Sequence, residues 1–182
     1  GLATVVPAGT ISFKDLWYDG NAEISTYTLS ESRYGEMRQG TRIMVFVTEP
    51  MRLSTHIKPD ALPPTEQMIQ VIKLNDLRKF ITGIYDYSVM TSVFAAVETK
   101  GPYENMATMK VAFSSQEWCG QVYDRYVRTP DTYDGAQFSY FETEGESKYF
   151  FPAKNVETEE GLWLRARELN GPWLQEGKPI TL

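Results

Sequence analysis

The chain has 182 residues and a formal net charge of −6, from 24 acidic and 18 basic residues. Hydrophobic residues make up 42% and charged residues 23%, which is typical of one globular domain with its own core rather than of a disordered chain. Because lysine and arginine form no cluster, nucleic-acid binding and adsorption to anionic lipid are disfavoured. No apolar run reaches about 18 residues, so we expect no transmembrane segment.

The first part of the chain favours strands. Aromatic residues make up 13% of the sequence, with 11 tyrosines. Ile11–Tyr18 and Ala22–Leu29 predict a hairpin, because the Asp19–Gly20 pair between them tolerates the positive φ angles of a tight turn. Residues 33–40 predict a charged loop or a short edge strand. Thr41–Thr48 has apolar groups on both faces and predicts a strand that is covered on two sides.

The middle of the chain continues this pattern after an irregular connection. Several prolines in residues 50–64 predict that connection. Thr65–Lys73 fits either a capped helix or a strand, and we favour a strand from about Met68 onward. Arg78–Tyr87 and Ser88–Glu98 predict two long strands or one bent pair.

Two hairpins and a helix follow. Ala107–Trp118 and Gln121–Arg128 predict a central strand pair, and Ala136–Glu142 predicts a pairing with Ser147–Phe151. Asn155–Leu169 predicts the one helix, since an Asn cap and glutamates lie near its start and arginines near its end.

These elements predict a mainly β protein. We expect an antiparallel, strongly curved sheet or barrel with one C-terminal helix that plugs or covers one end. Alternating strand–helix units are missing, which argues against a doubly wound parallel sheet. The expected organisation is a lead-in or linker at residues 1–10, a single β-rich domain at 11–170 and a tail at 171–182.

The stretch Met109–Val127 is the most informative one. With a strand period of two residues, Met109, Val111 and Phe113 share one face, and the same register brings Glu117 and Cys119 to that face. A buried, unpaired carboxylate costs several kcal/mol or takes up a proton. Three outcomes therefore stay open: a bulge near Gly120 turns Glu117 to solvent, a partner satisfies it, or this end opens into a pocket.

Five segments carry a resemblance to a known family: Asp19–Tyr34, Val45–Pro50, Val71–Asn75, Thr82–Ser92 and Ser114–Gly120. The strings TGIYDYSVMTS and SSQEWCG are the most specific. The chain resembles, from about Phe13 to Leu169, a family of uncharacterised bacterial secreted proteins and lipoproteins, some of which are labelled septum formation inhibitor. In that family a histidine often follows WCG, where this chain has Gln121.

The resemblance implies an exported protein that is periplasmic or on the outer surface and lipid-anchored in its full-length form. It also implies a natural chain that continues beyond Leu182. It brings no established activity, cofactor or catalytic residue.

An enzyme would have few groups to use. The only cysteine, Cys119, is the candidate nucleophile, with Glu117 and the only histidine, His56, as weak candidate partners. The alternative for Cys119 is a small buried apolar residue, and for His56 a surface position. A pair among Glu23, Glu36, Glu49 and Glu117 could in principle hydrolyse a glycosidic bond, but nothing in their spacing selects one. One Cys and one His are too few for zinc, and no cofactor motif is present.

A ligand cavity is the other hypothesis. Curved antiparallel sheets can enclose an apolar ligand, and the same methionines and aromatics could equally fill a packed core. The candidate ligand-binding residues are Glu117, Cys119, Arg33, Arg42 and Trp118, with the arginines placed to meet an anionic head group. We therefore expect a non-catalytic exported module that binds a lipid-like or other small apolar or amphipathic ligand or a cell-envelope protein. The alternative is a hydrolase-type enzyme that uses Cys119 and Glu117.

Overall fold

The computed structural model describes residues 12–168, 177, 179 and 181–182. The predicted lead-in at residues 1–10 and most of the predicted tail at 171–182 lie outside the described residues.

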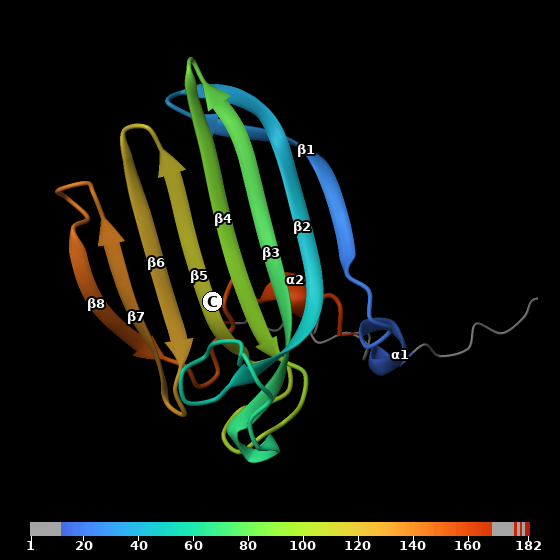
Figure 1. Cartoon of the computed structure of the whole chain (residues 1–182). Helices are drawn as coiled ribbons and strands as arrows, with labels where there is room; N and C mark the ends of the chain where they lie inside the picture. Colours follow the sequence, from blue (N-terminus) through green and yellow to red (C-terminus); the bar gives the residue numbers. More distant parts are fainter. Residues whose placement is uncertain (1–11, 169–176, 178, 180) are drawn as a thin grey trace, which may run out of the picture.

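All strands in the described residues belong to one antiparallel sheet (Figure 1). It has eight strands in the order of the chain, each paired with the next. The strands are β1 (Glu23–Arg33), β2 (Glu36–Arg52), β3 (Met68–Thr82), β4 (Tyr85–Ala96), β5 (Thr108–Glu117), β6 (Gly120–Arg128), β7 (Thr132–Ser139) and β8 (Glu146–Pro152). The remaining elements are two short helices, α1 (Phe13–Trp17) and α2 (Leu162–Arg165), and a 3-10 turn at Thr65–Gln67. The prediction of a mainly β, antiparallel protein is confirmed.

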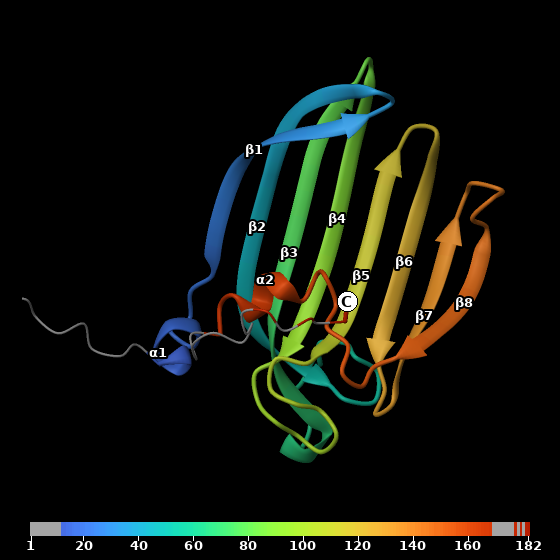
Figure 2. The ribbon, with the colours of Figure 1, turned by 180° about the vertical axis from the view of Figure 1, so that it is seen from behind.

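The sheet stays open. Pairing runs from β1 to β8, and no pairing in the described residues joins these two outer strands. The sheet is also not strongly curled, so closure into a barrel is not confirmed. Instead, the β1–β2 hairpin bends across the ends of the next strands, on the side that carries α2 (Figures 1 and 2). The hydroxyl groups of Tyr34 and Tyr87 lie 2.7 Å apart and hold the hairpin tip in this position.

The main core lies on the face of the sheet that α2 packs against, which we call the helix face. Alternate apolar residues of β2 to β5 line it at one end of the strands. This cluster contains Trp17, Met44, Phe46, Ile72, Leu74, Val93, Ala95, Met106, Val111 and Leu164. Since Trp17 comes from α1 and Leu164 from α2, both short helices are held by burial rather than by their own propensity.

A β-bulge in β5 places one side chain on the face opposite to the predicted one. Phe94 pairs with Lys110 and Ala95 with Thr108, so Met109 is the extra residue in β5. Met109 therefore packs with Phe94 in a second cluster, on the face opposite to that of Val111. The expectation that Met109 and Val111 share a face is wrong. Beyond the bulge, the predicted central pair of β5 and β6 forms with an unbroken register that ends at Glu117 and Gly120.

The predicted hairpin at the start of the chain is also wrong. Ser12 and Asp15 form a capping box, in which the Ser12 hydroxyl accepts from the Asp15 N–H and the Asp15 carboxylate accepts from the Ser12 N–H. This cap starts α1 where a strand was expected. The tight turn of the first hairpin is instead Tyr34–Gly35, where both residues have positive φ and which joins β1 to β2.

The C-terminal helix is much shorter than predicted. Asn155 has a φ of 59°, a left-handed conformation that begins no helix. The N–H of Glu157 donates to the Thr181 carbonyl instead of closing a helical turn. Only the four residues of α2 become helical, and Leu169 lies outside the described residues. No described helix is long and apolar enough to cross a membrane.

We expect Gly40→Ala to destabilise the fold. Gly40 lies in β2 opposite Phe80, and an added Cβ would collide with the Lys79 carbonyl oxygen and lie 2.8 Å from the Cβ of Phe80. Such overpacking against backbone should lower the free energy of unfolding by about 1–3 kcal/mol in urea titrations. Thr41→Ser, at the exposed neighbour, is the control and should change it by less than about 0.5 kcal/mol. Equal stability of both variants would contradict the packing at Gly40.

Candidate ligand-binding site

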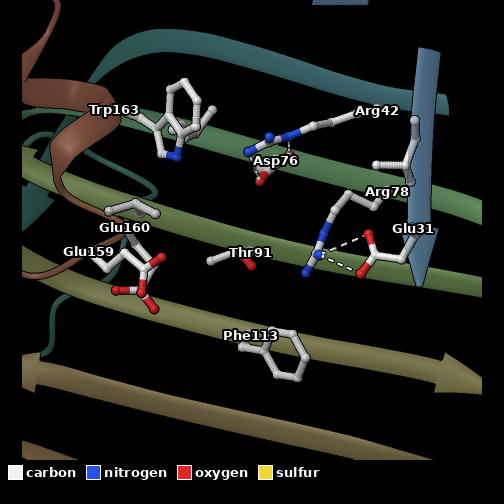
Figure 3. A pocket seen from close by; sticks show the side chains of 12 residues that line it. Glu31, Arg42, Asp76, Arg78, Thr91, Phe113, Glu159, Glu160 and Trp163 are labelled. Carbon is white, nitrogen blue, oxygen red and sulfur yellow. Dashed lines mark hydrogen bonds and ion pairs between the residues drawn. The ribbon is translucent and has the colours of Figure 1, made fainter. Parts of the chain in front are cut away.

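A pocket opens between the helix face and the segment that leads into α2 (Figure 3). We call it the first pocket, and its volume is about 360 Å³. Strands β1 to β5 form its floor and one side, and residues 159–163 form the opposite side. Its apolar lining comes from Leu29, Leu74, Val93, Phe113 and Trp163. Its polar lining comes from Glu31, Arg42, Asp76, Arg78, Thr91, Glu159 and Glu160.

Both arginines of the first pocket already have a carboxylate partner. Arg42 and Arg78 occupy opposite positions on β2 and β3, where two like charges repel. Arg42 donates two hydrogen bonds of 2.7 Å to Asp76, and this bonding raises the pKa of Arg42. Arg78 donates bonds of 3.2 and 3.3 Å to the two carboxylate oxygens of Glu31. Neither guanidinium is left as the counter-charge for an anionic head group.

Two glutamates on the other side of the pocket are not neutralised. Glu159 and Glu160 point toward the floor, and neither has an ion-pair partner in the described part of the chain. Glu160 accepts a 3.0 Å hydrogen bond from the Tyr126 hydroxyl. Burial, followed by the charge of Glu160, raises the pKa of Tyr126, so this hydroxyl stays a donor. With four carboxylates against two guanidiniums, the lining has a formal charge of −2.

Apolar side chains lie beside this negative charge. The Trp163 ring packs on the guanidinium of Arg42, whose central carbon lies 4.9 Å from the ring centroid. Trp163 is still 44% exposed, and Phe113 lies across the pocket from the α2 segment (Figure 3). The first pocket thus joins apolar walls to two carboxylates that no cation of the described residues neutralises.

The structure brings together two of the residues predicted from the sequence, Arg33 and Glu117, but outside the first pocket. Glu117 has a side chain that is only 5% exposed, and its Oε1 lies 4.0 Å from Nη2 of Arg33. Its Oε2 is buried and has no hydrogen-bond partner in the described residues. Arg33 also lies over the rings of Tyr34 and Tyr87, at 4.8 and 5.2 Å. Of the three outcomes that the sequence left open for Glu117, the structure shows no bulge near Gly120 and a partner, Arg33, that lies near only one of the two carboxylate oxygens.

The candidate nucleophile and base lie at opposite ends of β5. Cys119 is exposed in the β5–β6 turn, next to Trp118, which is 65% exposed. His56 is buried, and its carbonyl accepts from Lys110 near the other end of β5. At about 3.3 Å per residue, the strand from Lys110 to Glu117 is about 23 Å long. His56 therefore cannot act as the base for Cys119 in this structure. The alternatives of a buried Cys119 and a surface His56 are both wrong.

The four glutamates considered for glycosidic hydrolysis are each engaged by a different cation. Glu23 bonds with Arg167, and Glu36 lies 2.8 Å from Arg38. Glu49 lies between Lys58 and Lys73, and Glu117 meets Arg33. Within the described residues, no group of three or more His, Cys, Asp or Glu side chains is arranged to hold a metal ion.

Of the predicted ligand-binding residues, the first pocket contains only Arg42. Sequence reasoning missed Glu159, Glu160, Trp163 and the Arg78–Glu31 pair. The two glutamates were assigned to the first turn of a long helix, where acidic residues are common. Comparison of the chain with family models, curated proteins and solved structures found no match.

We expect Cys119 to react with a thiol reagent such as DTNB in the folded protein, because it is exposed in a turn. Its rate should lie within about threefold of that of glutathione, since no base lies beside it among the described residues. Cys119→Ser should abolish labelling and change the free energy of unfolding by less than about 0.5 kcal/mol. A thiol that is unreactive until the protein unfolds would contradict the exposed position.

A second prediction concerns pH. Burial lowers the pKa of His56 below its ordinary value of 6.5. The unfolded chain therefore binds a proton at this residue before the folded chain does, so stability should fall as pH decreases from about 7 to about 5. Because His56 is the only histidine, His56→Asn should remove this part of the slope in urea titrations, and Asn tolerates the φ of 54° at this position. Identical slopes for both proteins would refute the assignment.

Proposed function

We propose that the protein is a non-catalytic binding module whose first pocket takes a small cationic amphipathic molecule. The observation that carries this proposal is the charge of the lining: Arg42 and Arg78 are neutralised, whereas Glu159 and Glu160 have no cation among the described residues. The apolar part of the ligand would lie against Phe113 and neighbouring carbon surface.

The negative charge of the lining favours a cationic head group, whereas the sequence favours an anionic one. An anionic group placed near Arg42 would compete with Asp76 for a bidentate guanidinium and would meet the Glu159 and Glu160 carboxylates. An ammonium or guanidinium group would instead gain charge-assisted hydrogen bonds from its N–H donors to the Glu159 and Glu160 carboxylates. A cationic amphipath is therefore favoured over an anionic one.

The proposal also includes the expected location of the protein, its expected partner and the expected curvature of the sheet. Export to the periplasm or outer surface, a lipid anchor in the full-length form and a cell-envelope partner rest on the family resemblance. Stronger curvature or closure of the sheet would be expected only if the hairpin of β1 and β2 and the outer strands move closer around a ligand.

The test uses two probes with the same chain and opposite charge, octylammonium and octyl sulfate, below their micelle concentrations. By isothermal titration calorimetry, the cationic probe should bind at least about tenfold more tightly, since its head group meets unpaired carboxylates. Glu159→Gln combined with Glu160→Gln should remove most of this preference, because the amide introduced at position 160 keeps an acceptor for Tyr126 but carries no charge.

A matched control distinguishes the effect of the two pocket carboxylates from that of the protein's overall negative charge. Glu66→Gln with Glu142→Gln removes two exposed charges outside the first pocket and should leave the preference within about twofold of wild type. Equal affinity for the two probes, or an equal loss of preference in both double variants, would overturn the proposal.

A further inference from the structure

A second pocket lies on the same face, at the ends of β6 and β7, beneath the segment that follows β8. Its volume is about 440 Å³. The residues that matter here are Arg128 from β6, Tyr133 from β7, and Lys154, Glu157 and Arg165 from the C-terminal segment.

Arg128 is the unusual member of this lining, because it is a buried cation that no carboxylate of the described residues pairs with. It is only 8% exposed. Its Nη1 donates 2.7 Å to the Ala153 carbonyl and 3.3 Å to the Tyr133 hydroxyl. Its Nε is buried and has no hydrogen-bond partner in the part of the chain that the structure describes. In the residues that the structure describes, no Asp or Glu lies within ion-pairing distance of this guanidinium.

The neighbours of Arg128 cannot supply the missing charge. The Tyr133 hydroxyl donates to the Thr108 carbonyl at 2.9 Å, and burial raises the pKa of Tyr133, so it stays a neutral phenol. Glu157 is already engaged by Arg165, which donates to it at 2.6 Å. The guanidinium also lies over the Tyr133 ring, with its central carbon 5.2 Å from the ring centroid. Burying an arginine without a counter-charge costs free energy, and this ring and two dipolar acceptors on one nitrogen offset only part of that cost.

The formal charge of the whole lining is also positive. Arg128, Lys154 and Arg165 stand against Glu104 and Glu157, which leaves a formal charge of +1. Lys154 is exposed, so its ammonium group can reach a ligand without displacing core residues. The second pocket thus differs in charge from the first pocket, although both face the same segment of the chain.

We propose that the second pocket binds a small oxyanion, a carboxylate or phosphate group, with the Arg128 guanidinium as its counter-charge and Lys154 as a second contact. Arginine suits this role because its planar donor set matches carboxylate and phosphate oxygens. The site is separate from the one used by the proposed cationic amphipath, so it stands or falls independently of that function.

Isothermal titration calorimetry with inorganic phosphate and with citrate, each against chloride at equal ionic strength, tests this site. Wild type should bind at least one of the two more tightly than chloride, and which one binds distinguishes a phosphate from a carboxylate ligand. Lys154→Gln should weaken that binding about threefold, whereas Lys148→Gln, an exposed lysine on β8 outside the pocket, should leave it unchanged.

The arginine itself is tested with two variants. Arg128→Met should weaken binding at least about tenfold, and Arg128→Lys, which keeps the charge but loses the planar donor set, should lie in between. Far-UV circular dichroism without ligand checks that each variant folds, and if neither does, the comparison of Lys154→Gln with Lys148→Gln decides. Binding of neither anion by wild type, or unchanged binding by folded Arg128→Met or by Lys154→Gln, would overturn the proposal.

Discussion

The close contact of Gly161 with β5 determines where both pockets lie. A Cβ at Gly161 would collide with the Thr108 hydroxyl and lie 2.7 Å from that of Thr158, so only glycine lets this segment approach the sheet so closely. The two threonine hydroxyls share a buried hydrogen bond of 2.8 Å beside it. Thr108 faces the segment because the bulge at Met109 changes the side-chain alternation of β5. A bulge, a glycine and one hydrogen bond together fix the segment that both pockets share.

The segment divides charge between its two sides. Toward the first pocket it presents Glu159 and Glu160, and toward the second it presents Lys154 together with the Glu157–Arg165 pair. The arginines of the sheet have different partners in the two pockets. In the floor of the first pocket the arginines are paired with Asp76 and Glu31, whereas Arg128 is left with neutral acceptors. Because paired charges are largely cancelled, the unpaired groups set the sign of the charge that each pocket presents.

Period-two alternation in the sequence predicted most of the sheet, including the β5–β6 pair and its turn before Gly120. It could not locate the bulge at Met109, because an extra strand residue depends on the partner strand and leaves no mark in the apolar pattern. The predicted first hairpin rested on the Asp19–Gly20 pair alone, and the Ser12–Asp15 capping box that starts α1 was not recognised in the sequence. In the sequence, Glu159 and Glu160 fit the first turn of a helix as well as they fit the wall of a pocket. Only the left-handed conformation of Asn155 and the close contact at Gly161 show that the chain turns there instead.

Glu117 and Arg33 lie outside the first pocket but are connected to it through β1. Glu117 is almost fully covered, and its nearest cation belongs to the tip of the β1–β2 hairpin. That tip is also held by the hydrogen bond between Tyr34 and Tyr87 and by the guanidinium of Arg33 over their rings. Glu31 lies two residues before Arg33 on the same face of β1, so the position of the tip sets how Glu31 reaches Arg78. If the tip moved away, Arg78 would lose its carboxylate and the first pocket would become less negative. The buried Glu117 thus helps to keep the lining of the first pocket negative.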